Sequence, residues 1–218
     1  MKVAICISGE PRFFKEGYIS LKKNILDHND CDIFLQTYEG PDTEEIINTY
    51  KPVNTVIDKR IKDFHITFFS KFNRAPETNV ENMFWMFRNI KKSIELVGSD
   101  YDLIIRTRSD LIYQKPLILS RLDAKIVHIP SGGDWRKGIF DMFAISNVDN
   151  MRHYANVFDK LNSYIRLGVK AHPETLLKYH LLHGGHNFLK IIRFDFNIEL
   201  MRLTNGVIVT HLANKIQV

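Results

Sequence analysis

Short apolar runs rich in β-branched residues alternate along this chain with segments whose apolar residues recur at helical spacing. Lys2–Ile7 and Asp32–Thr37 are runs of the first kind, and the segment from Phe14 to about Asp27 is of the second kind. A strand, a helix and a second strand in this order form a βαβ unit, whose two strands lie parallel in one sheet. We therefore expect an α/β fold with a mostly parallel central sheet and helices on both faces.

The remainder of the chain continues this alternation. Further strands are expected at Thr55–Ile57, Leu103–Ile105, Lys125–Ile129, Phe140–Ile145, Phe188–Phe196 and Gly206–Thr210. Further helices are expected at Asn79–Val97, at Val148–Leu167 and from Pro173 to Gly184. Residues 44–47 belong to a loop or a short helix, and residues 60–78 have no clear pattern. Because no repeat, low-complexity tract or linker interrupts the sequence, we expect one domain over residues 1–218, which leaves open that it is part of a longer chain.

Composition and charge narrow the function classes only slightly. The net charge of +5 favours anionic ligands, but the Lys and Arg residues are spread along the chain, so nucleotides, anionic glycans and nucleic acid are all compatible with it. Cys6 and Cys31 do not form a CxxC pair, and we expect two reduced thiols rather than a zinc site or a disulfide. The first twelve residues are typical of a strand and not of a signal peptide or a membrane span. A cytoplasmic protein is therefore expected, with membrane association left to a larger chain or a partner.

Three charged residues follow the apolar run that begins at Leu103. These are Arg106, Arg108 and Asp110, and alternation along a strand would place all three on one side. In open α/β folds the C-terminal ends of the strands are where ligands bind. A guanidinium could hold a diphosphate there, and Asp110 could bind a divalent cation or a sugar hydroxyl. The alternative is an internal ion pair that closes the end of the sheet.

Two further groups of residues could carry chemistry. Ser8, Gly9 and Arg12 follow the first strand, where small residues let a nucleotide approach the backbone and Arg12 could reach a phosphate; the alternative is a plain turn. Asp141 lies among apolar residues and Glu174 at a helix start, and either could act as a general base. The alternatives are a charge at a strand edge for Asp141 and stabilisation of the helix dipole for Glu174.

Metal and phosphate motifs are weak in this sequence. Among the histidines, His211 is the best candidate metal ligand because it follows a predicted late strand, and no HExxH motif is present. Residues 131–138, SGGDWRKG, form a polar glycine-containing loop without the Lys-Ser/Thr ending of a phosphate-binding P-loop.

Five segments, taken in order, resemble GT-A-type glycosyltransferases. The resemblance is closest to small enzymes of bacterial envelope polysaccharide synthesis and of some large DNA viruses. The segments are ISGEPR (7–12), DIFLQTY (32–38), YDLIIRTRSDL (101–111), FDMFAISNVDNM (140–151) and HPETLL (172–177). They span most of the chain, and their order and spacing carry more weight than any one of them.

The resemblance implies a nucleotide-sugar donor, a UDP- or GDP-sugar, bound at the C-terminal ends of the first strands, and a glycan or glycoprotein acceptor. In such enzymes a DxD motif holds Mn²⁺ or Mg²⁺ on the diphosphate, whereas the matching triplet here is Arg108-Ser109-Asp110. Either Asp110 binds the ion, assisted by His211, or Arg108 supplies the positive charge itself. If the anomeric centre inverts, Asp141 is favoured over Glu174 as the base, and the 131–138 loop would close over the donor with Trp135 excluding water.

Two other functions remain open at this point. A sugar nucleotidyltransferase would share the topology, but the glycine- and lysine-rich N-terminal signature expected for it is missing. A basic module that binds RNA or anionic glycan would bind in a strongly salt-dependent way without turnover, but the dispersed charge and the lack of a nucleic-acid motif argue against it. Asp110→Asn separates these classes, because transfer should collapse whereas polyanion binding should be unchanged or tighter.

Overall fold

The computed structural model describes residues 1–60, 78–185, 189–204 and 207–212. The strands are β1 (Val3–Ser8), β2 (Cys31–Tyr38), β3 (Asn54–Asp58), β4 (Leu103–Thr107), β5 (Leu111–Tyr113), β6 (Val127–Pro130), β7 (Ala144–Ser146), β8 (Ile191–Phe194), β9 (Ile198–Thr204) and β10 (Val207–Leu212). The helices are α1 (Phe14–Asn24), α2 (Thr43–Tyr50), α3 (Val80–Glu95), α4 (Val148–Ala155), α5 (Val157–Arg166) and α6 (Pro173–His183), with 3₁₀ turns at Leu26–His28 and Leu119–Arg121.

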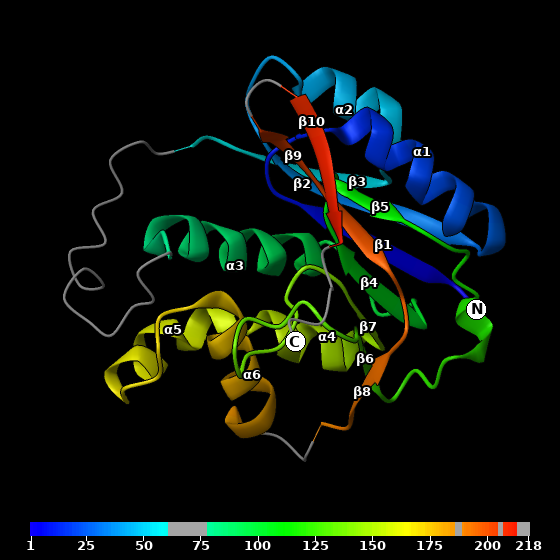
Figure 1. Ribbon diagram of the computed structural model, residues 1–218. Helices are drawn as coiled ribbons and strands as arrows, with labels where there is room; N and C mark the ends of the chain where they lie inside the picture. Colours follow the sequence, from blue (N-terminus) through cyan, green and yellow to red (C-terminus); the bar gives the residue numbers. More distant parts are fainter. Residues whose placement is uncertain (61–77, 186–188, 205–206, 213–218) are drawn as a thin grey trace.

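A seven-stranded, mostly parallel sheet in the order β3-β2-β1-β4-β7-β6-β8 forms the centre of the molecule. The strands from β3 to β4 are parallel, β7 runs antiparallel to both of its neighbours, and β6 pairs in parallel with β8. Helices α1 and α2 lie on one side of this sheet, and α3 to α6 lie on the other (Figure 1). The chain is therefore an α/β protein, as the sequence predicted.

Burial on both faces explains the continuous apolar character of the central strands. Val3, Ala4, Ile5 and Cys6 of β1 have no exposed surface, although successive side chains point to opposite faces. Cys6 and Cys31 are both free thiols, as expected, but only Cys6 is buried and Cys31 is partly exposed.

The connections place a topological switch between β1 and β4. From β1 the chain moves outward through β2 to β3, and after α3 it returns to the other side of β1 as β4. In open α/β sheets the crevice outside the C-terminal ends of two such strands is the usual ligand site. The end of β1, at Ser8, and the end of β4, at Thr107, therefore define where to look for one.

A smaller antiparallel sheet, β10-β9-β5, completes the fold beside the central one. It begins where β4 ends, because β5 follows β4 after only Arg108, Ser109 and Asp110. The apolar pair Leu111-Ile112 therefore forms a strand, but in a different sheet from β4 (Figure 1).

Two predicted elements need correction. The helix expected over Val148–Leu167 is two helices, because the N–H of Asn156 donates to the carbonyls of both Arg152 and His153, which tightens the turn and ends α4. Of the strand expected over Phe140–Ile145, only the last two residues are in a strand, because β7 begins at Ala144. Asp141 therefore precedes the strand instead of lying in it.

The late strands were only partly predicted. The strands expected over Phe188–Phe196 and Gly206–Thr210 correspond to β8 and β10, with residues 188 and 206 outside the described part of the chain. Strand β9 lies between them in the chain, pairs with both β5 and β10, and was not predicted. Most of the unpatterned segment 60–78, namely residues 61–77, also lies outside the described residues.

Candidate functional site

A cleft of about 400 Å³ opens at the C-terminal ends of β1, β2 and β4, at the topological switch. Its volume lies in the range of about 300–1,000 Å³ that is usual for small-molecule sites. The described residues that line it include Ser8, Gly9, Glu10, Arg12, Tyr38, Arg60, Arg106, Arg108, Ser109, Asp110, His172 and Arg202. All six residues predicted to bind a donor are in this set, so the structure brings them together; that they bind a donor stays a prediction.

Arg106 is the deepest charge of the cleft. It is only 1% exposed, and its Nε and Nη1 atoms have no hydrogen-bond partner among the described residues. Burial lowers the pKa of its guanidinium, and the neighbouring Tyr154 and Asp141 offset this only in part. A buried cation with unused donors is costly unless an anion arrives to pair with it. The position of Arg106 therefore favours an anionic ligand.

Asp110 is held by two arginines. Arg108 donates from Nε to Oδ1 at 2.8 Å and from Nη2 to Oδ2 at 2.6 Å, and Arg202 of the unpredicted strand β9 donates from Nη1 to Oδ2 at 3.3 Å. The internal ion pair that the sequence left open is thus present. It does not neutralise the cleft, because five guanidinium groups and two carboxylates belong to the described lining. The second carboxylate, Glu10, pairs with Arg60 at 2.5 Å.

Strand alternation does not explain how Arg106, Arg108 and Asp110 come together. Regular β structure stops at Thr107, and the next three residues form the link to β5. The three side chains share the cleft because this link turns at the sheet end, with the carbonyl of Asp110 accepting from the N–H of Met201 in β9 at 3.0 Å.

Two residues that the sequence analysis missed as structural parts of the site join its loops. The hydroxyl of Ser109 lies 3.2 Å from the carbonyl oxygens of both Glu10 and Arg12, so it connects the β4–β5 link to the loop after β1. Gly17 of α1 packs directly against this link, since a Cβ atom at this glycine would lie 1.8 Å from the carbonyl oxygen of Ser109. A glycine in the middle of a predicted helix was the available sequence signal.

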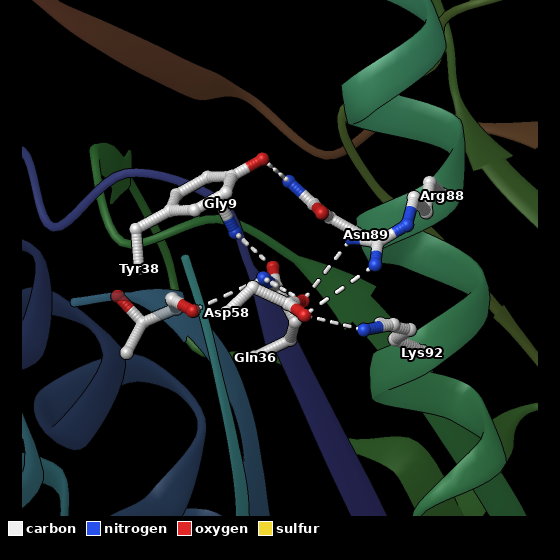
Figure 2. A network of polar contacts seen from close by, with 8 residues as sticks. Gly9, Gln36, Tyr38, Asp58, Arg88, Asn89 and Lys92 are labelled. Carbon is white, nitrogen blue, oxygen red and sulfur yellow. Dashed lines mark hydrogen bonds and ion pairs between the residues drawn. The ribbon is translucent and has the colours of Figure 1, made fainter. Parts of the chain in front are cut away.

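A polar network that extends from Gly9 to α3 holds the loop after β1 in place (Figure 2). The N–H of Gly9 donates to both the backbone and the side-chain oxygen of Gln36, at 3.2 and 3.1 Å. Gln36 in turn donates to Asp58 at 3.1 Å, and Asp58 is paired with Arg88 and Lys92 of α3. The N–H of Gly9 is therefore already engaged, so this residue offers the cleft an open surface but not its amide.

Two helix N-termini add to the positive potential of the cleft. Asn79, the N-cap of α3, accepts from the N–H of Asn82, and both residues line the cleft. His172 and Pro173 at the start of α6 line it as well. Because helix N-termini carry partial positive charge, both helices favour an anion in the cleft.

The two predicted bases, Asp141 and Glu174, are buried near each other and lie outside the described lining. Burial, reinforced by the charge of Asp141, raises the pKa of Glu174 to about 8. The Glu174 carboxylate accepts from the N–H of Trp135, and Gly138 packs against its Cβ. In this state Glu174 holds its proton at neutral pH and secures the loop, which does not suit a general base.

The glycine-containing loop 131–138 is a loop, as predicted, and Trp135 joins it to the cleft. The indole stacks on His172 with 3.9 Å between ring centroids. Asp134 accepts from the N–H of Phe140 and from Arg193, which anchors the other end of the loop. Closure of this loop over a ligand stays a prediction. The structure shows that Trp135 supports His172, which lines the cleft.

The surroundings of Asp110 do not fit a resident divalent cation. Both of its oxygens already accept from guanidinium groups, which a metal would have to displace. His211 is exposed in β10 and is not among the described residues of the cleft. No group of three His, Cys, Asp or Glu side chains suited to a metal occurs within the described ranges. The assignment of Asp110 and His211 as metal ligands stays a prediction, and we derive no step from it.

Comparison with protein-family models and with curated proteins gives no match to this chain. The family resemblance therefore rests on the sequence segments alone. In the part of the chain that the structure describes, no helix is both long enough and apolar enough to cross a membrane.

Proposed function

We propose that this protein is a glycosyltransferase whose cleft binds a nucleotide-diphosphate sugar through arginine side chains. The observation that carries the proposal is Arg106, a buried guanidinium with unused donors at the switch between β1 and β4. Dianionic diphosphates match such a site, because guanidinium groups bind phosphate oxygens bidentately. The transfer of a sugar, as opposed to binding alone, comes from the resemblance to GT-A-type enzymes.

The chemistry of the step follows from the charges. The bond between the anomeric carbon and the diphosphate oxygen breaks, and an acceptor hydroxyl forms the new bond to that carbon. Negative charge grows on the departing diphosphate, and Arg106, Arg108 and Arg202 would stabilise it without a reorganisation of the site. The same arginines would bind the donor in its ground state.

The acceptor hydroxyl must lose its proton. His172 is the base that we favour, because it lines the cleft whereas Asp141 and Glu174 do not. The two carboxylates that do line the cleft, Glu10 and Asp110, are held in ion pairs. Trp135 would orient the imidazole by stacking on it.

A thermal-shift panel of UDP-, GDP-, CMP- and dTDP-sugars, with and without Mn²⁺, tests the proposal. A donor at about a hundred times its Kd should add roughly 2.7 kcal/mol to the free energy of unfolding. Stabilisation by one nucleotide class without Mn²⁺ is expected if arginines hold the diphosphate, and a requirement for Mn²⁺ would restore Asp110 as a metal ligand.

Two variants then separate transfer from binding. His172→Gln should lower the turnover of the donor by about 10²–10⁴-fold with little change in donor affinity. Asp110→Asn should also impair transfer, because Asp110 would no longer hold Arg108 and Arg202 in position for the departing diphosphate, while polyanion binding becomes equal or tighter. If the wild-type protein and both variants bind polyanions but the wild-type protein turns over no sugar nucleotide, the protein is a binding module and the proposal is wrong.

A further inference from the structure

Next to α3, the described lining of the cleft includes several residues without formal charge. Thr78, Asn89, Tyr38 and Trp85 contribute to its lining there, and none of them carries a formal charge. A nucleotide sugar likewise has a charged diphosphate and neutral parts, namely the base, the ribose and the transferred sugar. These uncharged residues are therefore the candidates for selection among such ligands.

Two buried polar atoms in this part of the lining have no partner among the described residues. They are Oδ1 of Asn89, a residue that is 3% exposed, and Oγ1 of Thr78, a residue that is 8% exposed. Buried polar atoms in folded proteins nearly always have partners, so each such atom calls for an explanation. In a cleft, the simplest explanation is that the partner arrives with the ligand.

The orientation of Asn89 is set by its neighbour. Its Nδ2 donates to the hydroxyl of Tyr38 at 2.6 Å, and Figure 2 shows the side chain reaching from α3 toward the end of β2. The nitrogen thus has a partner, whereas the oxygen has none among the described residues. An amide oxygen only accepts, so the matching ligand group must donate.

We propose that Asn89 and Thr78 form a specificity site for polar groups on the neutral part of the nucleotide sugar, in which Oδ1 of Asn89 accepts a hydrogen bond and the hydroxyl of Thr78 accepts or donates one. This inference rests on the proposed function, because it takes the diphosphate to lie among the arginines. A site built around unpaired polar atoms rejects ligands that lack the matching group, since binding them would leave these atoms buried and unsatisfied.

Thr78→Val is the main test, since it removes the hydroxyl while keeping the shape of the side chain. Thr37→Val is its matched control, because Thr37 also has a buried Oγ1 without a partner among the described residues but does not belong to the described lining. Asn89→Leu is the second variant, with urea unfolding to verify that it folds. The probes are inorganic pyrophosphate, the free nucleoside diphosphates and the corresponding nucleotide sugars, each measured by calorimetry.

Thr78→Val and Asn89→Leu should each weaken the preferred nucleoside diphosphate about threefold to tenfold, with pyrophosphate affinity and the Thr37→Val control unchanged. A loss seen only with nucleotide sugars would support the site and assign the donor group to the transferred sugar. Equal affinities in all variants, or a parallel loss of pyrophosphate, would overturn the inference while the arginine site stands. Failure of the wild-type protein to bind pyrophosphate and every nucleotide would overturn the proposed function as well.

Discussion

At the scale of one residue, the buried guanidinium of Arg106 is the clearest sign of a ligand site. Removing a guanidinium from water costs several kcal/mol unless it is paired, and two of its three nitrogens lack partners among the described residues. The sequence could identify this arginine because a charge directly after three apolar β-type residues is unusual. The sequence could not reveal that Arg108, two positions later, donates hydrogen bonds to Asp110. Nor could it reveal that Nε and Nη1 of Arg106 have no partner among the described residues.

Arg106→Met should separate stability from binding. Because the substitution replaces an incompletely paired buried charge by an apolar side chain of similar length, the free energy of unfolding should stay the same or rise by about 1–4 kcal/mol. Pyrophosphate affinity should fall at least tenfold. Urea unfolding and calorimetry measure the two effects, with exposed Arg121→Met as the control. A destabilised variant with normal affinity would assign Arg106 a structural role.

At the scale of elements, continuous apolar runs predicted the buried central strands, and helical periodicity predicted the helices that bury one face. These patterns failed where tertiary contacts decide the outcome. β9 has a weak pattern of its own and exists because it pairs with β5 and β10, and its absence from the prediction hid Arg202. Asp141 was placed on a strand because its neighbours are apolar, but those neighbours pack as a buried loop before β7.

The contact between α1 and the β4–β5 link gives a prediction at this scale. Gly17→Ala should destabilise the protein by about 1–3 kcal/mol and weaken ligand binding, because the added Cβ would collide with the backbone of Ser109. Gly40→Ala is the control, as nothing lies near a Cβ atom there. Chemical denaturation of both variants measures the difference. If Gly17→Ala were as stable as the control, α1 would not set the position of the arginine-bearing link.

For the whole molecule, the net charge of +5 understates how its charge is arranged. Within the described residues, many basic side chains are balanced locally by surface ion pairs that contribute little to stability, whereas the cleft concentrates guanidinium groups in a partly buried space. Composition could therefore suggest an anionic ligand but not its place. The place comes from the strand order, which was predictable only as a parallel sheet and not as the particular order around β1.

Global stability should also depend on pH through Glu174. Its pKa is about 8 in the folded protein and near 4.5 in the unfolded chain, so the folded state holds the extra proton between these values. Stability from this group is complete below about pH 4.5, is lost as pH rises toward 8 and is constant above that. Urea midpoints from pH 5 to 9 should fall less steeply for Glu174→Gln than for wild type, whereas exposed Glu44→Gln should match wild type. Parallel curves for all three proteins would contradict the buried, protonated state.

The amide of Gly9, held by two oxygens of Gln36, has a consequence for how the site moves. Its proton can exchange with solvent only when the bond to a fully buried residue opens, and that residue is tied through Asp58 to α3. Slow hydrogen exchange is thus expected at a position that a glycine-containing turn would normally leave unprotected. The wall of the cleft at the end of β1 is then as rigid as the sheet beneath it. Little conformational entropy is therefore lost in ordering this wall when a ligand binds. The specificity of the cleft then depends on how well a ligand fits preformed groups.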